Sequence, residues 1–350
     1  RVWDLRTGTL LRTLRLPIGP GDEGRVYAVA ISPDGRTVAV GGWTGWDFDG
    51  SASIYLFDRV TGRITDRQPG LPNAILRLAF APDGQVLVAT LGENGIRVYR
   101  TSDYTLIGED RAYGGASYGA AFDRNGRLVT TSEDGFVRLY DFRFQLLAKQ
   151  RAPGGSEPLG VAFSPDGSQV AVGSYDSSKL AVLSGQDLSF RFAPDTSAVK
   201  NGNISSVAWS ADGSRLYAGG MYWHDGHSVR VWTNGGRGPA SNLPVSRSSI
   251  MSLVPLQDGG VAFGAGDPAY GVIDAQGRRT LFQGPTIADF RAVYTGAWRL
   301  SPDGKTIEYG YEVWGKTPAH FAVTARALAV GQSSGDKALS PPLVSATGLT

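Results

Sequence analysis

Short runs of alternating apolar and polar residues recur along the chain, and turn residues separate them. The runs VYAVAIS (26–32), ILRLAFA (75–81) and LGVAFS (159–164) each lead into a turn, and runs such as TVAVGG (37–42) and QVAVGS (169–174) follow one. Alternation with a period of two is the pattern of β-strands. Two such runs joined by Asp-Gly or Asn-Gly predict a β-hairpin.

The hairpin turn repeats at a nearly constant interval. Its copies are SPDG at 32, APDG at 81, DRNG at 123, SPDG at 164, SADG at 210, LQDG at 256 and SPDG at 301. Successive turn glycines are 49, 42, 41, 46, 46 and 45 residues apart. A period of this length indicates a repeat architecture in which each repeat is one supersecondary unit.

Each repeat contains two further runs after the hairpin. The third is rich in β-branched and aromatic residues, as in RVWD (1–4), IYLFD (54–58) and VRLYD (137–141), and the fourth follows a polar turn, as in LLRTL (10–14). A four-stranded sheet of this size cannot cover both of its faces, so such sheets pack radially against one another. The sequence therefore predicts an all-β fold, a β-propeller with seven four-stranded blades, with eight blades as the alternative.

The expected domain organisation is a single propeller over residues 1–350. Residues 1–14 are expected to form a half-blade of third and fourth strands, residues 15–330 about seven repeats, and residues 331–350 a connecting tail. The half-blade either completes the last blade or belongs to a blade upstream. Because the chain starts at a third strand and ends in a Pro/Ser/Thr-rich stretch, it is interpreted as a piece of a longer protein.

Composition narrows the classes of function. The net charge is +2 and the 34 basic residues are scattered, so no nucleic-acid footprint is expected. The absence of cysteine excludes disulfides, thiol catalysis and zinc-thiolate sites. No apolar run reaches the length that spans a bilayer, so membrane insertion is not expected. Compartment and oligomeric state stay open.

Four long loops are rich in aromatic residues. They are GWTGWDFDGSA (42–52), MYWHDGHS (221–228), GAGDPAYG (264–271) and YEVWGKTPAH (311–320), and all are expected on the irregular face, opposite the hairpin turns. Tryptophan and tyrosine are the usual anchors of interfaces, although any one of them is more often buried by packing. The predicted partner-binding residues are Trp43, Trp46, Asp47, Phe48, Asp49, Tyr222, Trp223, His224, Tyr270 and Trp314.

Motifs for catalysis or metal binding are weak. GASYG (115–119) and GQSSG (331–335) match the spelling of a nucleophile elbow, but no helical pattern follows either of them. HDGH (224–227) lacks the further ligands that zinc requires, and DFDG (47–50) lacks the spaced acidic residue of a calcium loop. We predict no catalytic residues, no metal and no cofactor, and we interpret the PDG aspartates as turn formers.

The third strands RVWD (1–4), LYD (139–141) and RVWT (230–233), together with the SPDG hairpin before them, resemble those of WD-repeat β-propellers. The divergent repeats, the GGWTGWDFDG insert and the arginine bias resemble, more narrowly, WD-repeat regions of large bacterial proteins, some with a caspase-like peptidase domain elsewhere. The Asp-His-Ser-Trp network common in the family is missing, because the three histidines do not precede first strands. Packing and backbone pairing are therefore expected to hold the blades together.

Two functions from different classes remain. The first is a non-catalytic scaffold that presents one propeller face to a protein or peptide, as a module of a larger bacterial protein. The alternative is a propeller enzyme or small-ligand binder of the lactonase, peptidase-associated or quinoprotein type that uses the central channel. It requires Asp47, Asp49, His224, Asp225, His227 and Asp267 to converge near the channel.

Overall fold

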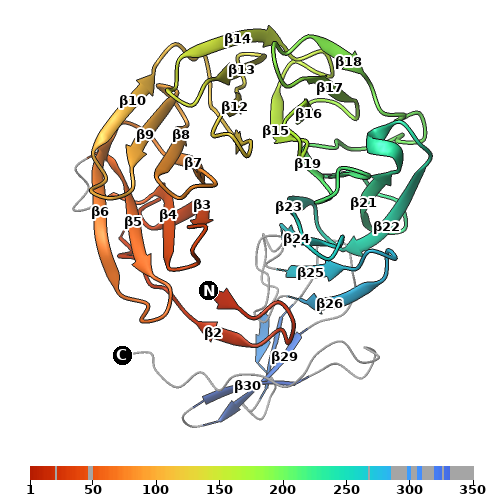
Figure 1. Cartoon of the computed structure of the whole chain (residues 1–350). Helices are drawn as coiled ribbons and strands as arrows, with labels where there is room; N and C mark the ends of the chain where they lie inside the picture. Colours follow the sequence, from red (N-terminus) through yellow and green to blue (C-terminus); the bar gives the residue numbers. More distant parts are fainter. Residues whose placement is uncertain are drawn as a thin grey trace.

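The computed structural model describes residues 1–19, 22–45, 50–266 and 269–284, together with the backbone of four later strands between 298 and 331. Figure 1 shows six four-stranded antiparallel sheets arranged around a central channel. In each of the six sheets the strands are hydrogen-bonded in chain order, and the first strand lies innermost.

The first three sheets run from residue 25 to residue 151. Their strands are β3 (Arg25–Ile31), β4 (Thr37–Trp43), β5 (Ala52–Asp58), β6 (Ile64–Leu71), β7 (Ile75–Phe80), β8 (Val86–Leu91), β9 (Ile96–Arg100), β10 (Leu106–Asp110), β11 (Gly119–Phe122), β12 (Leu128–Thr131), β13 (Phe136–Tyr140) and β14 (Leu146–Arg151). All neighbouring strands pair antiparallel, as the alternating sequence pattern predicts.

The next three sheets run from residue 158 to residue 283. Their elements are β15 (Pro158–Phe163), β16 (Gln169–Ser174), β17 (Leu180–Ser184), β18 (Phe190–Phe192), β19 (Ser206–Trp209), β20 (Leu216–Gly219), β21 (His227–Trp232), the 3₁₀ turn η1 (Asn234–Gly236), β22 (Ala240–Ser246), β23 (Ile250–Pro255), β24 (Val261–Ala265), β25 (Ala269–Ile273) and β26 (Arg279–Gln283). The short turn η1 is the only helix among the described residues.

Two smaller pieces flank this series. β1 (Val2–Trp3) and β2 (Leu10–Arg12) form a two-stranded sheet between the last of the six blades and the first. The strands β27 (Trp298–Leu300), β28 (Thr306–Tyr309), β29 (Ala319–Thr324) and β30 (Ala327–Gly331) pair in a sheet of their own, and Figure 1 draws β29 and β30 outside the ring.

The prediction of seven blades, with eight as the alternative, is wrong: the ring that the structure describes has six four-stranded blades. The inner strands β3, β7, β11, β15, β19 and β23 contact one another in succession. The predicted turn at 301–304 lies outside the described residues; the strands on either side of it, β27 and β28, pair within the β27–β30 sheet, and none of the described contacts makes β27 a member of that succession. The number of repeated turns predicts the number of hairpins. A hairpin forms part of a blade in the ring only when its sheet packs face to face with neighbouring sheets.

The hairpin turns explain why SPDG recurs. In the first copy Gly35 has a φ of +70° and donates its N–H to the Ser32 carbonyl at 2.8 Å. Asp34 accepts hydrogen bonds from the Ser32 hydroxyl at 2.5 Å and from the Arg36 N–H at 3.0 Å. Glycine adopts this φ without strain, and aspartate bonds its own turn backbone. The interpretation of the PDG aspartates as turn formers is confirmed.

These turns make stability depend on pH. The Ser hydroxyls beside Asp34, Asp166 and Asp212 are the largest cause that holds each carboxyl pKa below its usual value, to about 2 for Asp212. A carboxyl with a lowered folded pKa stabilises the fold above its unfolded pKa of about 3.9 and loses that contribution as pH falls through the folded value. We expect the urea midpoint to fall between about pH 4 and pH 2, and to fall less in the Asp34→Asn/Asp166→Asn/Asp212→Asn variant. Equal acid sensitivity of the two proteins would contradict this assignment.

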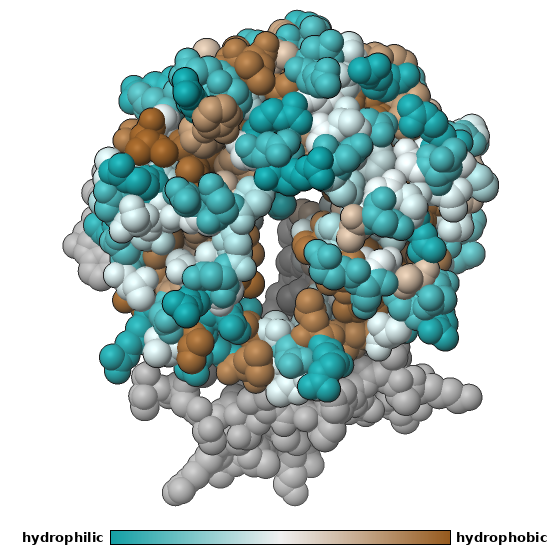
Figure 2. Space-filling view, in the orientation of Figure 1, coloured by the Kyte–Doolittle hydropathy of each residue, from teal (hydrophilic) through white to brown (hydrophobic). Residues whose placement is uncertain are grey.

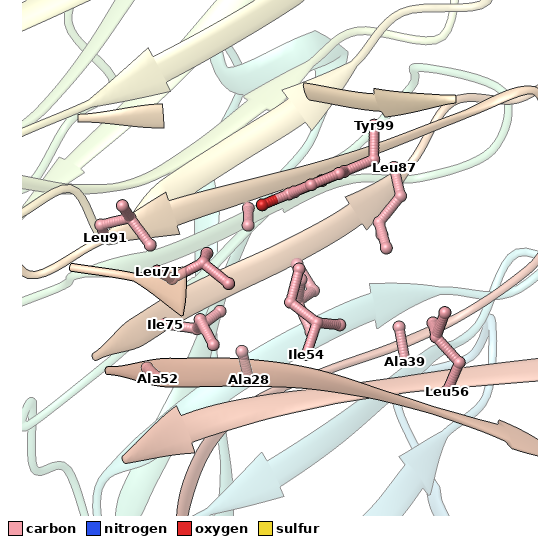
Figure 3. Packing of buried hydrophobic residues seen from close by; sticks show 12 residues of the cluster. Ala28, Ala39, Ala52, Ile54, Leu56, Leu71, Ile75, Leu87, Leu91 and Tyr99 are labelled. Carbon is pink, nitrogen blue, oxygen red and sulfur yellow. The ribbon is translucent and has the colours of Figure 1, made fainter. Parts of the chain in front are cut away.

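The hydrophobic core lies between adjacent sheets. Figure 3 shows the cluster shared by the first two blades, in which Ile54 and Leu56 of β5 face Leu87 of β8 and Tyr99 of β9. Comparable clusters join later neighbours, including one around the fully buried Trp232. Because adjacent sheets bury these side chains against each other, stability accumulates from blade-to-blade packing.

A buried polar network also joins strands of the third blade. Arg138 is 1% exposed, donates to Asp134 through both terminal nitrogens and lies 3.9 Å above the Tyr113 ring. The Tyr113 hydroxyl is 2.6 Å from the Thr130 hydroxyl and 2.9 Å from that of Tyr140. The expectation that packing and backbone pairing alone hold the blades is therefore wrong for this blade, because arginine and tyrosine replace the missing histidine network.

Candidate interaction surface

The predicted partner-binding residues lie in different environments. Trp46, Asp47, Phe48, Asp49 and Trp314 lie outside the described residues, as does Asp267 of the alternative channel site. Trp43 ends β4 and is half-buried. Tyr270 lies within β25 rather than in a loop, and its ring packs 5.4 Å from that of Trp3.

In the loop between β20 and β21, two consecutive aromatic residues lie in different environments. Tyr222 is 1% exposed and belongs to the core between the fourth and fifth blades, whereas Trp223 is 47% exposed. A partner cannot reach Tyr222, so we remove it from the candidate surface. His224 is exposed and its ring stacks on that of Tyr222 at 6.5 Å.

Two asparagines from the loop before β19 hold this arrangement. Asn201 accepts a hydrogen bond from the Trp223 N–H at 2.9 Å and donates to the Trp223 carbonyl at 3.1 Å. Asn203 accepts from the Met221 N–H at 3.0 Å and donates to the Tyr175 carbonyl at 2.8 Å. Side chains therefore tie together the exposed ends of the fourth and fifth blades, which fixes the position of Trp223.

The structure adds exposed residues that the sequence reasoning missed. Tyr27, Tyr118 and Met251 are 47%, 37% and 67% exposed, and each lies five residues before a hairpin turn, near the start of an inner strand. Tyr175 and Met221 are 56% and 49% exposed and follow second strands. All five lie at the ends of strands opposite the hairpin turns. Alignment of the repeats on their turns is the signal that could have found the first three.

We call these residues, with Trp223, the mouth surface. Its members are Tyr27, Tyr118, Tyr175, Met221, Trp223 and Met251. Partial burial raises the pKa of Tyr118, and the neighbouring Glu133 carboxylate, Tyr27 and Tyr175 add to the increase. Glu133, Tyr27 and Tyr175, which raise the pKa of Tyr118, come from three other loops or strands. The surface combines large, partly apolar side chains with one nearby carboxylate.

The catalytic and metal motifs find no supporting geometry in the described part of the chain. Ser117 of GASYG is fully buried and donates its hydroxyl to the Thr131 carbonyl at 2.8 Å, so its hydroxyl is not available to a substrate. GQSSG includes residues that the structure does not describe. No group of three or more His, Asp or Glu side chains in the described ranges could hold a metal ion. None of the helices in those ranges is long and apolar enough to cross a membrane.

Comparison with known proteins gives partial matches. The WD40 family, described as "WD domain, G-beta repeat", matches residues 8–55, 111–141, 148–178 and 195–233. Telomerase protein component 1 of Rattus norvegicus is 30% identical over 179 residues, which is 49% of this chain and 6% of that protein. Protein tipD of Dictyostelium discoideum is 25% identical over 127 residues, or 35% of this chain and 19% of that protein.

These matches support the resemblance to WD repeats that the third strands and hairpin turns indicated. The chain spans only a small part of the relatives that it matches. Relatives from rat, mouse and Dictyostelium give no support to a bacterial origin or a caspase-like partner domain.

Proposed function

We propose that this WD-repeat-like propeller is a non-catalytic scaffold that binds a protein or peptide through the mouth surface. The proposal rests on one observation: five of the six blades contribute an exposed large side chain to the same face. Single exposed apolar residues are ordinary, but a gathering of them marks interaction sites. WD propellers are typical protein-interaction scaffolds, and we place the chain's role within a larger protein because its relatives are much longer.

The composition of the mouth surface suits protein recognition. Tyrosine and tryptophan supply most of the binding energy at many interfaces, since they bury a large area at little entropic cost. Contacts between neighbouring blades, together with the hydrogen bonds of Asn201 and Asn203, hold the loops in place before binding. Preorganisation of this kind lowers the entropy lost on association.

The test is a pull-down with three forms of the chain. The Tyr175→Ala/Trp223→Ala variant removes two mouth residues, and the Phe142→Ala/Phe190→Ala variant removes two aromatics that are 61% and 58% exposed elsewhere. We expect a partner that wild type and the Phe variant retain alike and that binds the Tyr/Trp variant at least about tenfold more weakly, a difference of about 1.4 kcal/mol. If all three folded proteins retained the partner equally, the proposal would be wrong.

A further inference from the structure

A shallow depression of about 380 Å³ lies between the third and fourth blades. It is lined by Gly135, by Arg151 at the end of β14, by the loop 152–156 that leads to β15, and by Lys179 before β17. Because β15 starts at the end opposite its hairpin turn, this loop lies on the same face of the ring as the mouth surface. Figure 1 draws β14 and β15 across the ring from β2 and β26.

The depression contains two cations without carboxylate partners. Arg151 and Lys179 are exposed, and no acidic residue lines the depression with them. Neither side chain forms an ion pair or a hydrogen bond with the part of the chain that the structure describes. The guanidinium of Arg151 lies 4.8 Å from the centre of the Phe136 ring, and the Lys149 ammonium lies 4.4 Å from it. This contact positions Arg151 without neutralising its charge.

Exposed charge alone does not distinguish this place. Hydrophilic residues cover much of the face of the ring that Figure 2 shows. Many exposed arginines are paired, as Arg100 is with Asp103 at 2.7 Å and Arg111 with Glu109 at 3.0 Å. The depression differs because its two cations come from neighbouring blades and lack such a partner within the described residues.

The loop that lines the depression adds backbone donors. A Cβ on Gly154 would lie 3.2 Å from the Lys179 carbonyl oxygen, and one on Gly155 would lie 2.5 Å from a carboxylate oxygen of Asp176, so the loop is packed tightly against the β16–β17 loop. Ser156 donates its N–H to Asp176 at 2.9 Å and its hydroxyl to the same carboxylate. The N–H groups of Gly154 and Gly155 have no acceptor in the described chain. Two cations and two unpaired donors therefore line one depression.

The depression is continuous with the mouth surface. The Tyr175 N–H donates to the Glu157 carbonyl at 2.8 Å, so the exposed Tyr175 lies at the end of the same loop. Asn203 then links the Tyr175 carbonyl to the N–H of Met221. A bound segment that crosses Tyr175 therefore passes from the depression towards the exposed side chains of Met221 and Trp223.

We propose that this depression binds a carboxylate of the protein or peptide that the mouth surface binds. The inference rests on the proposed function, and it specifies the partner as a segment with an acidic residue beside its apolar or aromatic residues. The planar Arg151 guanidinium matches a carboxylate with two parallel N–H groups, and Lys179 adds a third charge-assisted donor.

The surroundings favour a carboxylate over a more highly charged ligand. Asp176 and Glu157 adjoin the loop that lines the depression, and their negative charges repel a phosphate chain more strongly than a single carboxylate. The net charge of the chain is only +2, and its basic residues form no long run. An acidic protein segment therefore fits this site better than a nucleic acid does.

The probe is the fluorescein-labelled peptide Glu-Glu-Gly-Gly-Leu-Trp-Leu, compared with its Gln-Gln counterpart at the same salt concentration. We expect fluorescence anisotropy to show at least about tenfold tighter binding of the acidic peptide to the wild-type chain. The Arg151→Gln/Lys179→Gln variant should lose this preference. The Arg143→Gln/Arg191→Gln variant loses the same charge from two exposed arginines elsewhere, so it should keep the preference. Circular dichroism checks that both variants fold.

Three results would overturn the proposal. The first is no binding, or equal binding of the two peptides, by the wild-type chain. The second is an equal loss of the preference in the two charge-matched variants, which would mean that net charge alone attracts the peptide. The third is tighter binding of a twelve-residue oligothymidylate that the Arg151→Gln/Lys179→Gln variant loses, which would assign the depression to a nucleic acid.

The pull-down separates failure of this inference from failure of the proposed function. We expect the Arg151→Glu/Lys179→Glu variant to retain the partner at least about tenfold more weakly, and the Arg143→Glu/Arg191→Glu variant to retain it normally. A partner lost by the Tyr175→Ala/Trp223→Ala variant but fully retained by Arg151→Glu/Lys179→Glu would overturn the carboxylate site and leave the proposed function intact. The reverse pattern would support the carboxylate site and contradict binding through the mouth surface.

Discussion

Replacement of Arg138 by leucine is expected to lower the free energy of unfolding by about 3–5 kcal/mol, the range for breaking a buried ion pair. Arg138 is almost completely buried, and its loss leaves the Asp134 carboxylate without its partner. Burial is the largest influence and raises the pKa of Asp134, but the hydrogen bonds and charge of Arg138, together with the N–H groups of Gly114 and Phe136, outweigh it and hold the pKa at about 2. The stacking on Tyr113 is lost as well. Urea unfolding followed by circular dichroism measures the change.

Arg111→Ala supplies the matched control. Arg111 also pairs with a carboxylate, Glu109, at 3.0 Å, but its side chain is 65% exposed. Exposed pairs contribute about 0–1 kcal/mol, so this variant should unfold almost as wild type does. If the two variants lost similar amounts of stability, the third blade would not depend on its buried network. Packing and backbone pairing would then suffice to hold this blade, as the sequence analysis expected.

The second large effect concerns Tyr222. Tyr222→Ala is expected to destabilise the fold by about 3–5 kcal/mol, as deletion of a buried aromatic ring does, because the ring fills the core shared with Leu180 and Trp232. Thermal and urea unfolding both report the loss. Binding by the variant at temperatures where it remains folded should be nearly normal, since Tyr222 does not reach the surface.

Its neighbour Trp223 should behave in the opposite way. Trp223→Ala removes a half-exposed ring whose backbone is held by Asn201, so the free energy of unfolding should change by less than about 1 kcal/mol. Partner binding should fall instead. A Trp223 variant that unfolds as easily as the Tyr222 variant would place the tryptophan in the core and remove it from the mouth surface.

Local chemistry made the blades predictable. Ser32, Asp34 and Gly35 form a turn from their own side chains and backbone, and the alternating runs on either side pair because their apolar positions face neighbouring sheets. The residues that make these interactions lie within about 50 positions of one another, so the sequence pattern of a single repeat predicts them. The strand order within each described blade follows directly.

The number of blades was not predictable in the same way. Whether the β27–β30 hairpins enter the ring depends on face-to-face packing between sheets distant in the sequence, and a turn at 301–304 looks the same in either case. The mouth surface was only partly predictable from the sequence, for a related reason. Tyr222 and Trp223 are adjacent and chemically alike, and only the placement of the loop against the fourth blade decides which is buried.

The junction between the sixth and first blades differs from the other five. At those five the inner strands of neighbouring blades contact each other, whereas in the described chain the sixth and first blades are joined through the two-stranded β1–β2 sheet. Trp3 packs on Tyr270 of the sixth blade, and Arg12 donates to the Thr61 carbonyl of the first. In arrays of repeats stability is summed over nearest-neighbour interfaces, and the units with the smallest interface open most easily. We therefore expect the ring to open first at this junction, and the third blade, which holds the buried Arg138 network, to open late.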